Sequence, residues 1–125
     1  MPTIRITTLK PRSTEQAATL ATALSACISA VLGVPEKDNW IVQESPGSGY
    51  FSTGEAGSED YAVVTIEMFP GRAIEKKRAL YAGIAAAFEA HGTPGQNLRI
   101  VVLEVPPENW GIYGGQAASD IFKKS

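Results

Sequence analysis

The stretch YAVVTIEMFPGRAIEKKRALYAGIAAAFEAHGTPGQNLRIVVLE, residues 61–104, decides the fold of this chain. Apolar residues alternate along both of its ends, as in half-buried strands, and recur at helical spacing in its middle. We expect these segments in order: a strand over 61–68, a turn over 69–72, a helix over 73–90 and a strand over 98–104. A strand, a helix and a strand in this order form a right-handed βαβ unit with parallel strands.

The helix predicted over 73–90 carries its own end signals. Gly92 and Pro94 end it, because glycine favours a helix C-terminus and proline prevents the helix from resuming. His91 fits a C-terminal charge or cap better than a metal ligand. Four residues have the spacing of one inward face: Ile74, Leu80, Ile84 and Phe88.

The same succession of features occurs about 60 residues earlier, which indicates a duplicated unit rather than a short solenoid repeat. Ser13, with Gln16 three residues later, fits a capping box at a helix N-terminus. Gly33 and Pro35 stop that helix. The other segments of this first unit are a strand over 2–9, a turn over 10–12 and a strand that begins at Trp40.

Two such units predict an α+β (α/β) fold, in which tandem βαβ units form a four-stranded mixed sheet with two helices on one face. The length of 125 residues suits a single domain over 1–125, with pseudo-repeats at 2–44 and 61–104. We expect the uncovered face of the sheet to be apolar and exposed, which predicts oligomerisation.

The segments outside the two repeats have a different composition. Residues 45–60 are rich in Gly and Ser and predict a loop with a short strand at 50–51. The tail, 105–125, begins with a turn and a glycine-rich hairpin, and residues 116–120 have a polar helical pattern. Its glycines lack the spacing and the Lys-Ser/Thr ending of a phosphate loop, so we expect an interface hairpin.

Composition excludes several classes of function. The net charge is −2 and there is no basic stripe, so we expect no nucleic-acid and no membrane partner. The apolar runs are too short for a membrane span, and the first 12 residues do not fit a signal peptide. The single Cys27 cannot form an internal disulfide, which agrees with a cytoplasmic location. No Cys/His cluster has metal-ligand spacing, so we expect no metal.

Pro2 is the residue with the most unusual chemistry. A small second residue usually lets the cell remove Met1, and Pro2 would then carry a free secondary amine. Such an α-amino group titrates near ~8 in water. Burial beside arginines lowers its pKa and favours a neutral base at working pH. Most Met-Pro starts mean only that Met1 is removed, and a retained Met1 would block the amine.

Four motifs together resemble the tautomerase superfamily, whose members are built from βαβ units and use an amino-terminal proline. The motifs are Met1-Pro2-Thr3-Ile4-Arg5-Ile6, the turn Pro70-Gly71-Arg72 followed by Glu75-Lys76-Lys77-Arg78, Arg99 in the last strand, and the segment from Glu108 to Gly115. The resemblance spans nearly the whole chain. Its double length is similar to the fused groups, such as malonate semialdehyde decarboxylase and cis-3-chloroacrylic acid dehalogenase, and its ending is similar to 4-oxalocrotonate tautomerase.

The resemblance implies roles for the residues that match. Pro2 matches the catalytic proline, and Arg72 matches the turn arginine that binds a substrate carboxylate. A guanidinium fork suits a carboxylate and also stabilises charge that develops on a carbonyl oxygen. Asp38 falls where the decarboxylase has a catalytic aspartate, although it also fits a cap between loop and strand. Arg99 matches a strand arginine that assists substrate binding, and its counterpart in the first repeat is Trp40.

The remaining implied residues surround the substrate. Trp110 matches the aromatic residue that walls the pocket, although packing or a trimer contact would also explain it. Phe69 would help Trp110 to exclude water. Arg12 occupies the turn position of the first repeat, where it would line a degenerate second pocket or act structurally. The family also implies a homotrimer that acts on a small carboxylate without a cofactor.

Departures from the hydrolytic groups favour the simplest reaction. Pro70 stands where the decarboxylase has a second arginine, and the first helix lacks the histidine of the dehalogenase. Keto–enol tautomerisation needs only one base, one arginine and a dry pocket. We therefore expect a tautomerase that acts on a small 2-oxo acid. A decarboxylase or hydratase of the same superfamily and a non-catalytic trimeric carboxylate-binding protein are the alternatives.

Overall fold

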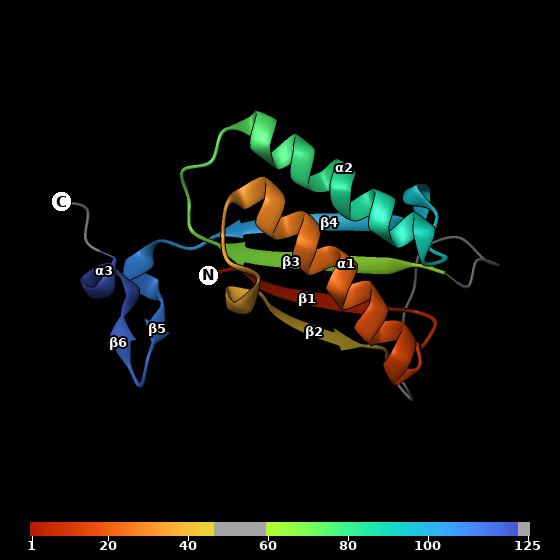
Figure 1. The fold of residues 1–125 in the computed structure, drawn as a ribbon, viewed down its shortest axis with the longest axis horizontal. Coiled ribbons are helices and arrows are strands. Elements are labelled where there is room, and N and C mark those ends of the chain that lie inside the picture. The colour runs from red at the N-terminus through yellow and green to blue at the C-terminus, as the bar shows by residue number, and fades with distance from the viewer. Residues whose placement is uncertain (47–59, 123–125) are drawn as a thin grey trace.

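A computed structural model describes residues 1–46 and 60–122 of the chain. The short strand expected at 50–51 lies outside the described residues. Figure 1 shows a sheet with two long helices and a small hairpin at one end. In chain order the main elements are β1 (Thr3–Thr8), α1 (Thr14–Leu32), β2 (Trp40–Glu44), β3 (Ala62–Met68), α2 (Ile74–Ala90) and β4 (Leu98–Glu104).

The sheet has the strand order β2-β1-β3-β4 and joins two parallel pairs through an antiparallel centre. Both predicted βαβ units are thereby confirmed. Thr3 pairs with Trp40 in the first unit, and Val63 pairs with Arg99 in the second. Because β1 and β3 run in opposite directions, the two units are related by an approximate two-fold axis. The start of β1 therefore lies beside the end of β3.

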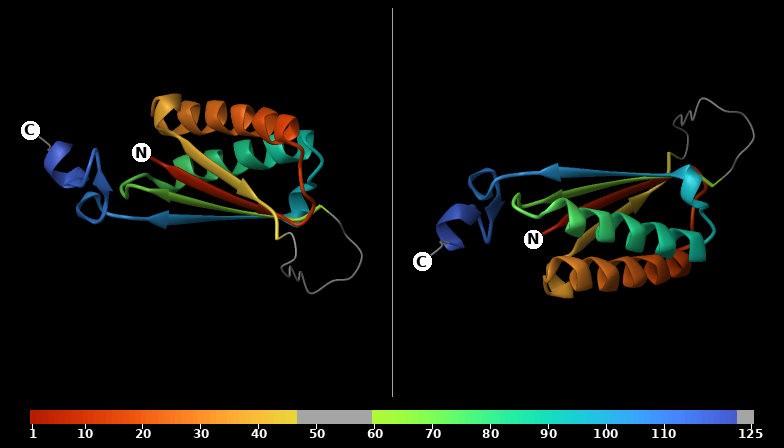
Figure 2. Two further views of the ribbon diagram at one scale, coloured as in Figure 1. Left: turned by 90° about the horizontal axis from the view of Figure 1, so that it is seen from below. Right: turned by 90° about the horizontal axis from the view of Figure 1, so that it is seen from above.

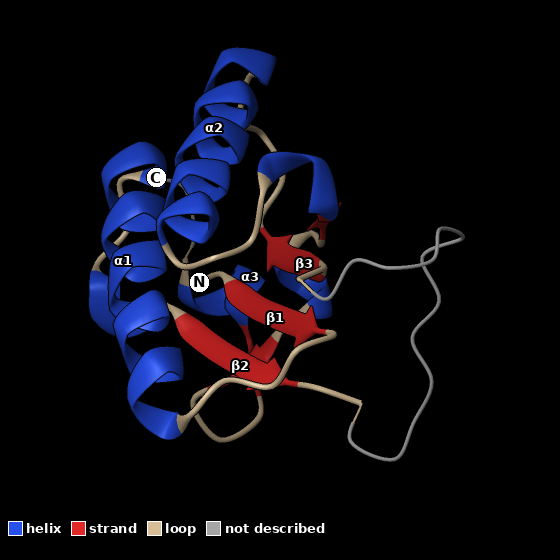
Figure 3. Cartoon of the chain, turned by 90° about the vertical axis from the view of Figure 1, so that its right-hand side faces the viewer, coloured by secondary structure: helices blue, strands red, loops and turns tan. Residues whose placement is uncertain are grey.

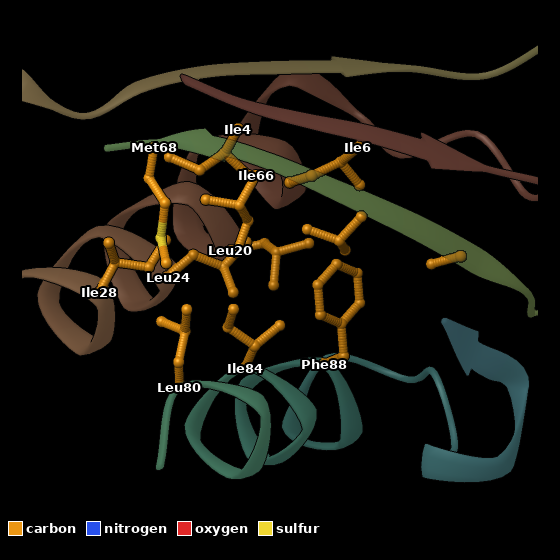
Figure 4. Packing of buried hydrophobic residues seen from close by; sticks show 12 residues of the cluster. Ile4, Ile6, Leu20, Leu24, Ile28, Ile66, Met68, Leu80, Ile84 and Phe88 are labelled. Atoms are coloured by element: carbon orange, nitrogen blue, oxygen red, sulfur yellow. The ribbon is translucent and has the colours of Figure 1, made fainter. Parts of the chain in front are cut away.

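Both helices cover the same face of the sheet, as the views along the sheet show (Figures 2 and 3). The strands alternate, so that every second residue of β1 and β3 faces the helices and is buried. Figure 4 shows the resulting core, in which Phe88 and Ile84 of α2 point toward the sheet. The residues of this core with no exposed surface are Ile4, Leu20, Leu24, Ile28, Val64, Ile66, Leu80, Ile84 and Phe88.

The helix ends follow the sequence signals for the most part. Ser13 and Gln16 form the predicted capping box, and Gly33 ends α1 in the left-handed conformation at φ 71°. His91 caps α2, and its Nδ1 lies 2.7 Å from the carbonyl oxygen of Ala87. The prediction that Ile74 faces inward was wrong, because Ile74 is the first residue of α2 and is 50% exposed.

The two helices approach each other closely where Gly83 of α2 faces Cys27 of α1. A Cβ atom built on Gly83 would collide with the Cys27 Sγ atom, so a larger residue at position 83 would force the helices or the thiol to shift. Burial raises the pKa of the Cys27 thiol, which keeps the thiol protonated. Cys27 therefore packs between the helices, although it is only partly buried.

The outer face of the sheet is apolar only along its edges. The exposed apolar residues there belong to the two edge strands: Trp40 and Val42 of β2, and Val101 and Leu103 of β4. On the central strands, Arg5 forms an ion pair with Glu67, with Nε and Oε1 3.2 Å apart. The expectation of an apolar, exposed outer face is therefore confirmed along the two edge strands, where the apolar side chains form two strips, whereas an ion pair lies on the central strands.

The tail forms a small hairpin at the end of the sheet where β1 begins (Figure 1). Its strands are β5 (Gly111–Ile112) and β6 (Gln116–Ala117), followed by the short helix α3 (Ala118–Ile121). The helical pattern predicted for 116–120 therefore begins two residues later, because 116–117 pair with β5. Tyr113 lies in the hairpin turn with φ 49°, an uncommon conformation for a residue other than glycine.

Helix α1 is long and apolar enough, by length and composition alone, to cross a membrane. In this fold its residues Leu20, Leu24 and Ile28 are fully buried in the domain core. Small residues occupy most of its other positions, which raises the mean hydropathy of the helix without adding large exposed apolar side chains. Packing in the core therefore accounts for these three large apolar residues.

Candidate active site

Three segments meet around the amino terminus. The antiparallel pairing of β1 with β3 places Thr3 opposite Glu67, so the turn after β3 lies beside the first residues of the chain. The parallel pairing of β1 with β2 brings Trp40 to the same place. The hairpin of the tail lies at this end as well (Figures 1 and 2).

A pocket of about 400 Å³ opens between the amino terminus and the hairpin. Most of its wall is apolar or aromatic, and among the lining residues Asp38 has the only charged side chain. The residues that line the pocket are Met1, Pro2, Thr3, Asp38, Trp40, Trp110, Gly111, Ile112, Tyr113 and Gly114. The chain thus places an amine and a carboxylate in one largely apolar cavity, which is the usual character of a small-molecule site.

Pro2 is buried and held by the sheet. Its carbonyl oxygen accepts a hydrogen bond from the Trp40 N–H at 3.2 Å, which extends the pairing of β1 with β2 by one residue. In this structure Met1 precedes Pro2, so the Pro2 nitrogen belongs to a peptide bond and the terminal amine is that of Met1.

Opposing effects act on the terminal amine. Burial lowers the pKa of the Met1 amino group, Asp38 raises this pKa, and Arg72 adds to the lowering. Burial has the largest effect because it removes water from the cationic form. The amine is therefore more easily deprotonated than an exposed α-amino group.

Asp38 lies in a 3₁₀ turn, Glu36–Asp38, that connects α1 to β2. Its own N–H donates to the Pro35 carbonyl oxygen at 3.0 Å. The next residue, Asn39, ties the turn to α1, because its Nδ2 donates to the hydroxyl oxygens of Ser25 and Ser29, both at 2.9 Å. Asp38 therefore lies between α1 and β2 and lines the pocket, and both its catalytic role and its role as a cap stay predictions.

Arg72 lies close enough to influence the amine, but it is not among the residues that line the pocket. Its guanidinium donates to the carbonyl oxygens of Phe69 at 3.4 Å and of Leu32 at 3.3 Å. The Leu32 carbonyl belongs to the last turn of α1, where a cation is favourable. Arg72 therefore links the turn after β3 to the end of α1, and its binding of a carboxylate stays a prediction.

Trp110 and Phe69 are in contact but play different parts. Trp110 lines the pocket, and its Nε1 donates to the Val105 carbonyl oxygen at 2.9 Å. Phe69 packs edge-on against the Trp110 ring with centroids 5.5 Å apart, and it is not among the pocket-lining residues. The structure thus places Trp110 in the wall and Phe69 behind it as a support.

Arg12 and Arg99 lie at the opposite end of the sheet from Pro2. Arg12 donates to Thr93 Oγ1 at 3.1 Å and lies over the Phe88 ring, 5.8 Å from its centroid. It also lines another pocket, of about 380 Å³, together with Asp60 and His91. Arg99 pairs with Val63 near the start of β3. Neither arginine therefore meets Pro2 within one chain.

Some of the site could not be predicted from the motifs. Trp40, Ile112 and Tyr113 line the pocket, and the exposed fractions of Trp40 and Tyr113 are 71% and 62%. Asn39 anchors the turn that carries Asp38. Of these residues, Trp40 alone could be noticed in the sequence, because the two repeats differ at this position and the second repeat has Arg99 there. Within residues 1–46 and 60–122, no group of three His, Cys, Asp or Glu side chains could hold a metal ion.

Comparison with known proteins identifies the class. A family model described as "Tautomerase enzyme" matches residues 41–113, which is more than half of the chain. The chain therefore belongs to the tautomerase family, and it is an enzyme of that superfamily by relationship. The 2-hydroxymuconate tautomerase of Comamonas testosteroni is 43% identical over 53 residues, which cover 42% of this chain and 84% of that protein. A tautomerase of the same name from Pseudomonas putida matches to the same extent.

Solved structures share the whole fold. Native fused 4-OT has a TM-score of 0.82 at 21% identity and covers 95% of this chain and 98% of its own. FG41 malonate semialdehyde decarboxylase has a TM-score of 0.79 at 24% identity and covers 98% of this chain and 97% of its own. These likenesses show the fused βαβ architecture, whereas the two tautomerase relatives match over 42% of this chain.

Proposed function

We propose that this protein is a cofactor-independent tautomerase that interconverts the keto and enol forms of a small 2-oxo acid. Its general base is the amine of Pro2, exposed after removal of Met1. The observation that carries the proposal is the meeting of the amino terminus with Asp38 and Trp110 in one largely apolar pocket. The family match and the tautomerase relatives support it.

The proposed reaction moves one proton and needs no other reactant. The neutral Pro2 amine takes the enol hydroxyl proton, the carbonyl forms, and the same proton is delivered to carbon, so that the amine ends neutral. Burial lowers the pKa of the Met1 amine in this pocket, and this supports the role because a Pro2 amine exposed there would be buried in the same surroundings. We assign Arg72 to the substrate carboxylate and carbonyl oxygen, and Asp38 to orienting the substrate or a water molecule.

The assembly belongs to the same proposal. We propose a homotrimer located in the cytoplasm, without a nucleic-acid or membrane partner. The apolar strips on the two edge strands support assembly, and the structurally similar fused 4-OT forms a symmetric trimer. A trimer would also allow Arg99 of one chain to reach the Pro2 pocket of another, which it cannot do within one chain.

The test compares the unmodified protein with Pro2→Ala on an enolised 2-oxo acid. Alanine is also small, so Met1 is still removed and a primary amine replaces the secondary amine. We expect a large loss of kcat, measured by the disappearance of enol absorbance, and intact mass verifies the terminus in both proteins. Undiminished turnover by Pro2→Ala would refute Pro2 as the base.

A second candidate is decarboxylation or hydration at the same site, which one observation favours. Asp38 raises the pKa of the terminal amine and thus favours its cationic form, which could act as an acid. Release of carbon dioxide from a β-keto acid would establish this alternative. A protein that catalyses tautomerisation but releases no carbon dioxide would exclude decarboxylation. A retained Met1 together with stoichiometric acid binding would instead indicate a carboxylate-binding protein without catalysis.

A further inference from the structure

In both repeats the connection from the helix to the next strand has the same backbone form, but its side chains differ. Residues Pro35 to Asn39 and Pro94 to Leu98 both form a proline, a 3₁₀ turn and an extended residue before a strand. The strand registers make Trp40 equivalent to Arg99, so Asn39 is equivalent to Leu98. The second repeat thus builds the same turn with an apolar residue that packs against the core.

Asn39 instead belongs to a polar cluster with α1. Its Nδ2 donates to Ser29 Oγ and Ser25 Oγ at 2.9 Å and to the Ser25 carbonyl oxygen at 3.2 Å. Its Oδ1 is buried and has no hydrogen-bond partner among the described residues. The positions in α2 equivalent to Ser25 and Ser29 are Ala85 and Glu89.

This comparison acts as a control within one molecule. A buried carbonyl oxygen without a partner is destabilising, whereas the second repeat places the apolar Leu98 at the same position of its turn. The Asn39 cluster lies in the repeat whose turn is beside the amino terminus, and the equivalent positions of the second repeat, among the described residues, hold Leu98, Ala85 and Glu89. The fold therefore does not explain the cluster, and its position suggests a role in the site.

Both neighbours of Asn39 in the sequence lie beside the amino terminus. The preceding residue, Asp38, lines the pocket, and the N–H of the following residue, Trp40, donates to the Pro2 carbonyl oxygen. The anchor at Asn39 fixes both neighbours relative to α1, because its side chain is hydrogen-bonded to two serines of that helix.

We propose that Asn39 is a positioning residue, which holds the Asp38 carboxylate and the start of β2 in place against the amino terminus. The proposal rests on the proposed function, since it refines the site of the terminal amine. The charged groups that act on the amine are Asp38, from the turn before β2, and Arg72, from the turn after β3. The hairpin contributes only uncharged side chains to the pocket.

The experiment replaces Asn39 with the residue that the second repeat uses. In Asn39→Leu, Asp38 is held less firmly and stabilises the cationic amine less. We expect the titration of the amine, followed by NMR on isotopically labelled amino-terminal proline, to move to lower pH. The acid limb of the pH profile of kcat/KM should move with it. Asp38→Asn should shift both in the same direction, and Asn39→Leu should add no further shift to Asp38→Asn.

Matched controls separate positioning from stability. Leu98→Ala reduces stability at the equivalent turn far from the amine and should leave the titration unchanged. If Asn39→Leu does not fold, Ser25→Ala removes one acceptor of the anchor and should give a smaller shift in the same direction. An unmoved titration in the folded variant, or an equal shift in the Asp38→Asn background, would overturn the proposal. The NMR readout does not depend on turnover, so a failure of the proposed catalytic activity is seen separately in Pro2→Ala.

Discussion

The contact between Gly83 and Cys27 gives a stability prediction whose sign depends on the partner residue. Gly83 lies inside α2, and a Cβ atom there would collide with the Cys27 Sγ atom. Inside a helix the Cys27 side chain has few alternative rotamers, because one of the three staggered positions clashes with the preceding turn. The substitution Gly83→Ala therefore forces the helices apart or the thiol into a strained position.

Two opposing contributions determine the size of the effect. Alanine is favoured over glycine in a helix interior by about 1 kcal/mol, whereas overpacking of a core contact costs about 1–3 kcal/mol. Gly83→Ala should therefore lower the free energy of unfolding by an amount between about zero and about 2 kcal/mol. In a Cys27→Ala background the collision is absent, and the same substitution should stabilise the protein by about 1 kcal/mol.

The assay is urea unfolding of the four proteins of the cycle at one fixed protein concentration, since assembly makes the apparent stability concentration-dependent. The coupling between Gly83→Ala and Cys27→Ala should be about 1–3 kcal/mol. The reasoning fails if Gly83→Ala has the same effect in both backgrounds, because the helix contact then carries no steric constraint.

Three further predictions concern other parts of the molecule. Trp110→Ala should lower kcat/KM of the proposed tautomerase by opening the pocket wall, whereas an unchanged value would place Trp110 outside the substrate contacts. The hydrogen bond from Lys77 lowers the pKa of Glu104. The ionised carboxylate therefore contributes stability above its unfolded pKa, and this stability is lost as the pH falls. Lys77→Met should weaken this dependence of stability on pH, as measured by thermal melts at several pH values. Arg12→Ala should reduce stability by about 1 kcal/mol, because Thr93 loses its hydrogen-bond donor. It should leave kcat/KM unchanged, since Arg12 lies at the opposite end of the sheet from Pro2. A loss of activity without a loss of stability would contradict that placement.

The architecture could be predicted from the sequence because each βαβ unit carries local signals. The capping box at Ser13, the left-handed Gly33 and the alternation along β1 and β3 all act over a few residues. Ile74 was placed wrongly because periodicity gives the direction of a side chain but not where the core ends. Ile74 lies in the first turn of α2 and is half exposed there.

The site could be predicted only in part, since it depends on long-range pairing. Pro2, Asp38 and Trp110 line one pocket as the family motifs implied. The roles of Trp40 and Asn39 follow from strand register and helix packing, which motif spacing does not encode. The separation of Arg99 from Pro2 likewise depends on the register of β3 with β4.

The approximate two-fold axis has a consequence for the number of sites. A covalently joined pair of βαβ units has two equivalent sheet ends but a single amino terminus, so amine chemistry is confined to one site per chain. A reagent that modifies the terminal amine should therefore saturate at one equivalent, whatever the assembly. At the other end no amino terminus is present, and the residues equivalent to Asn39 and Trp40 there are Leu98 and Arg99. Fusion halves the number of sites and gives the second end room to acquire a different role.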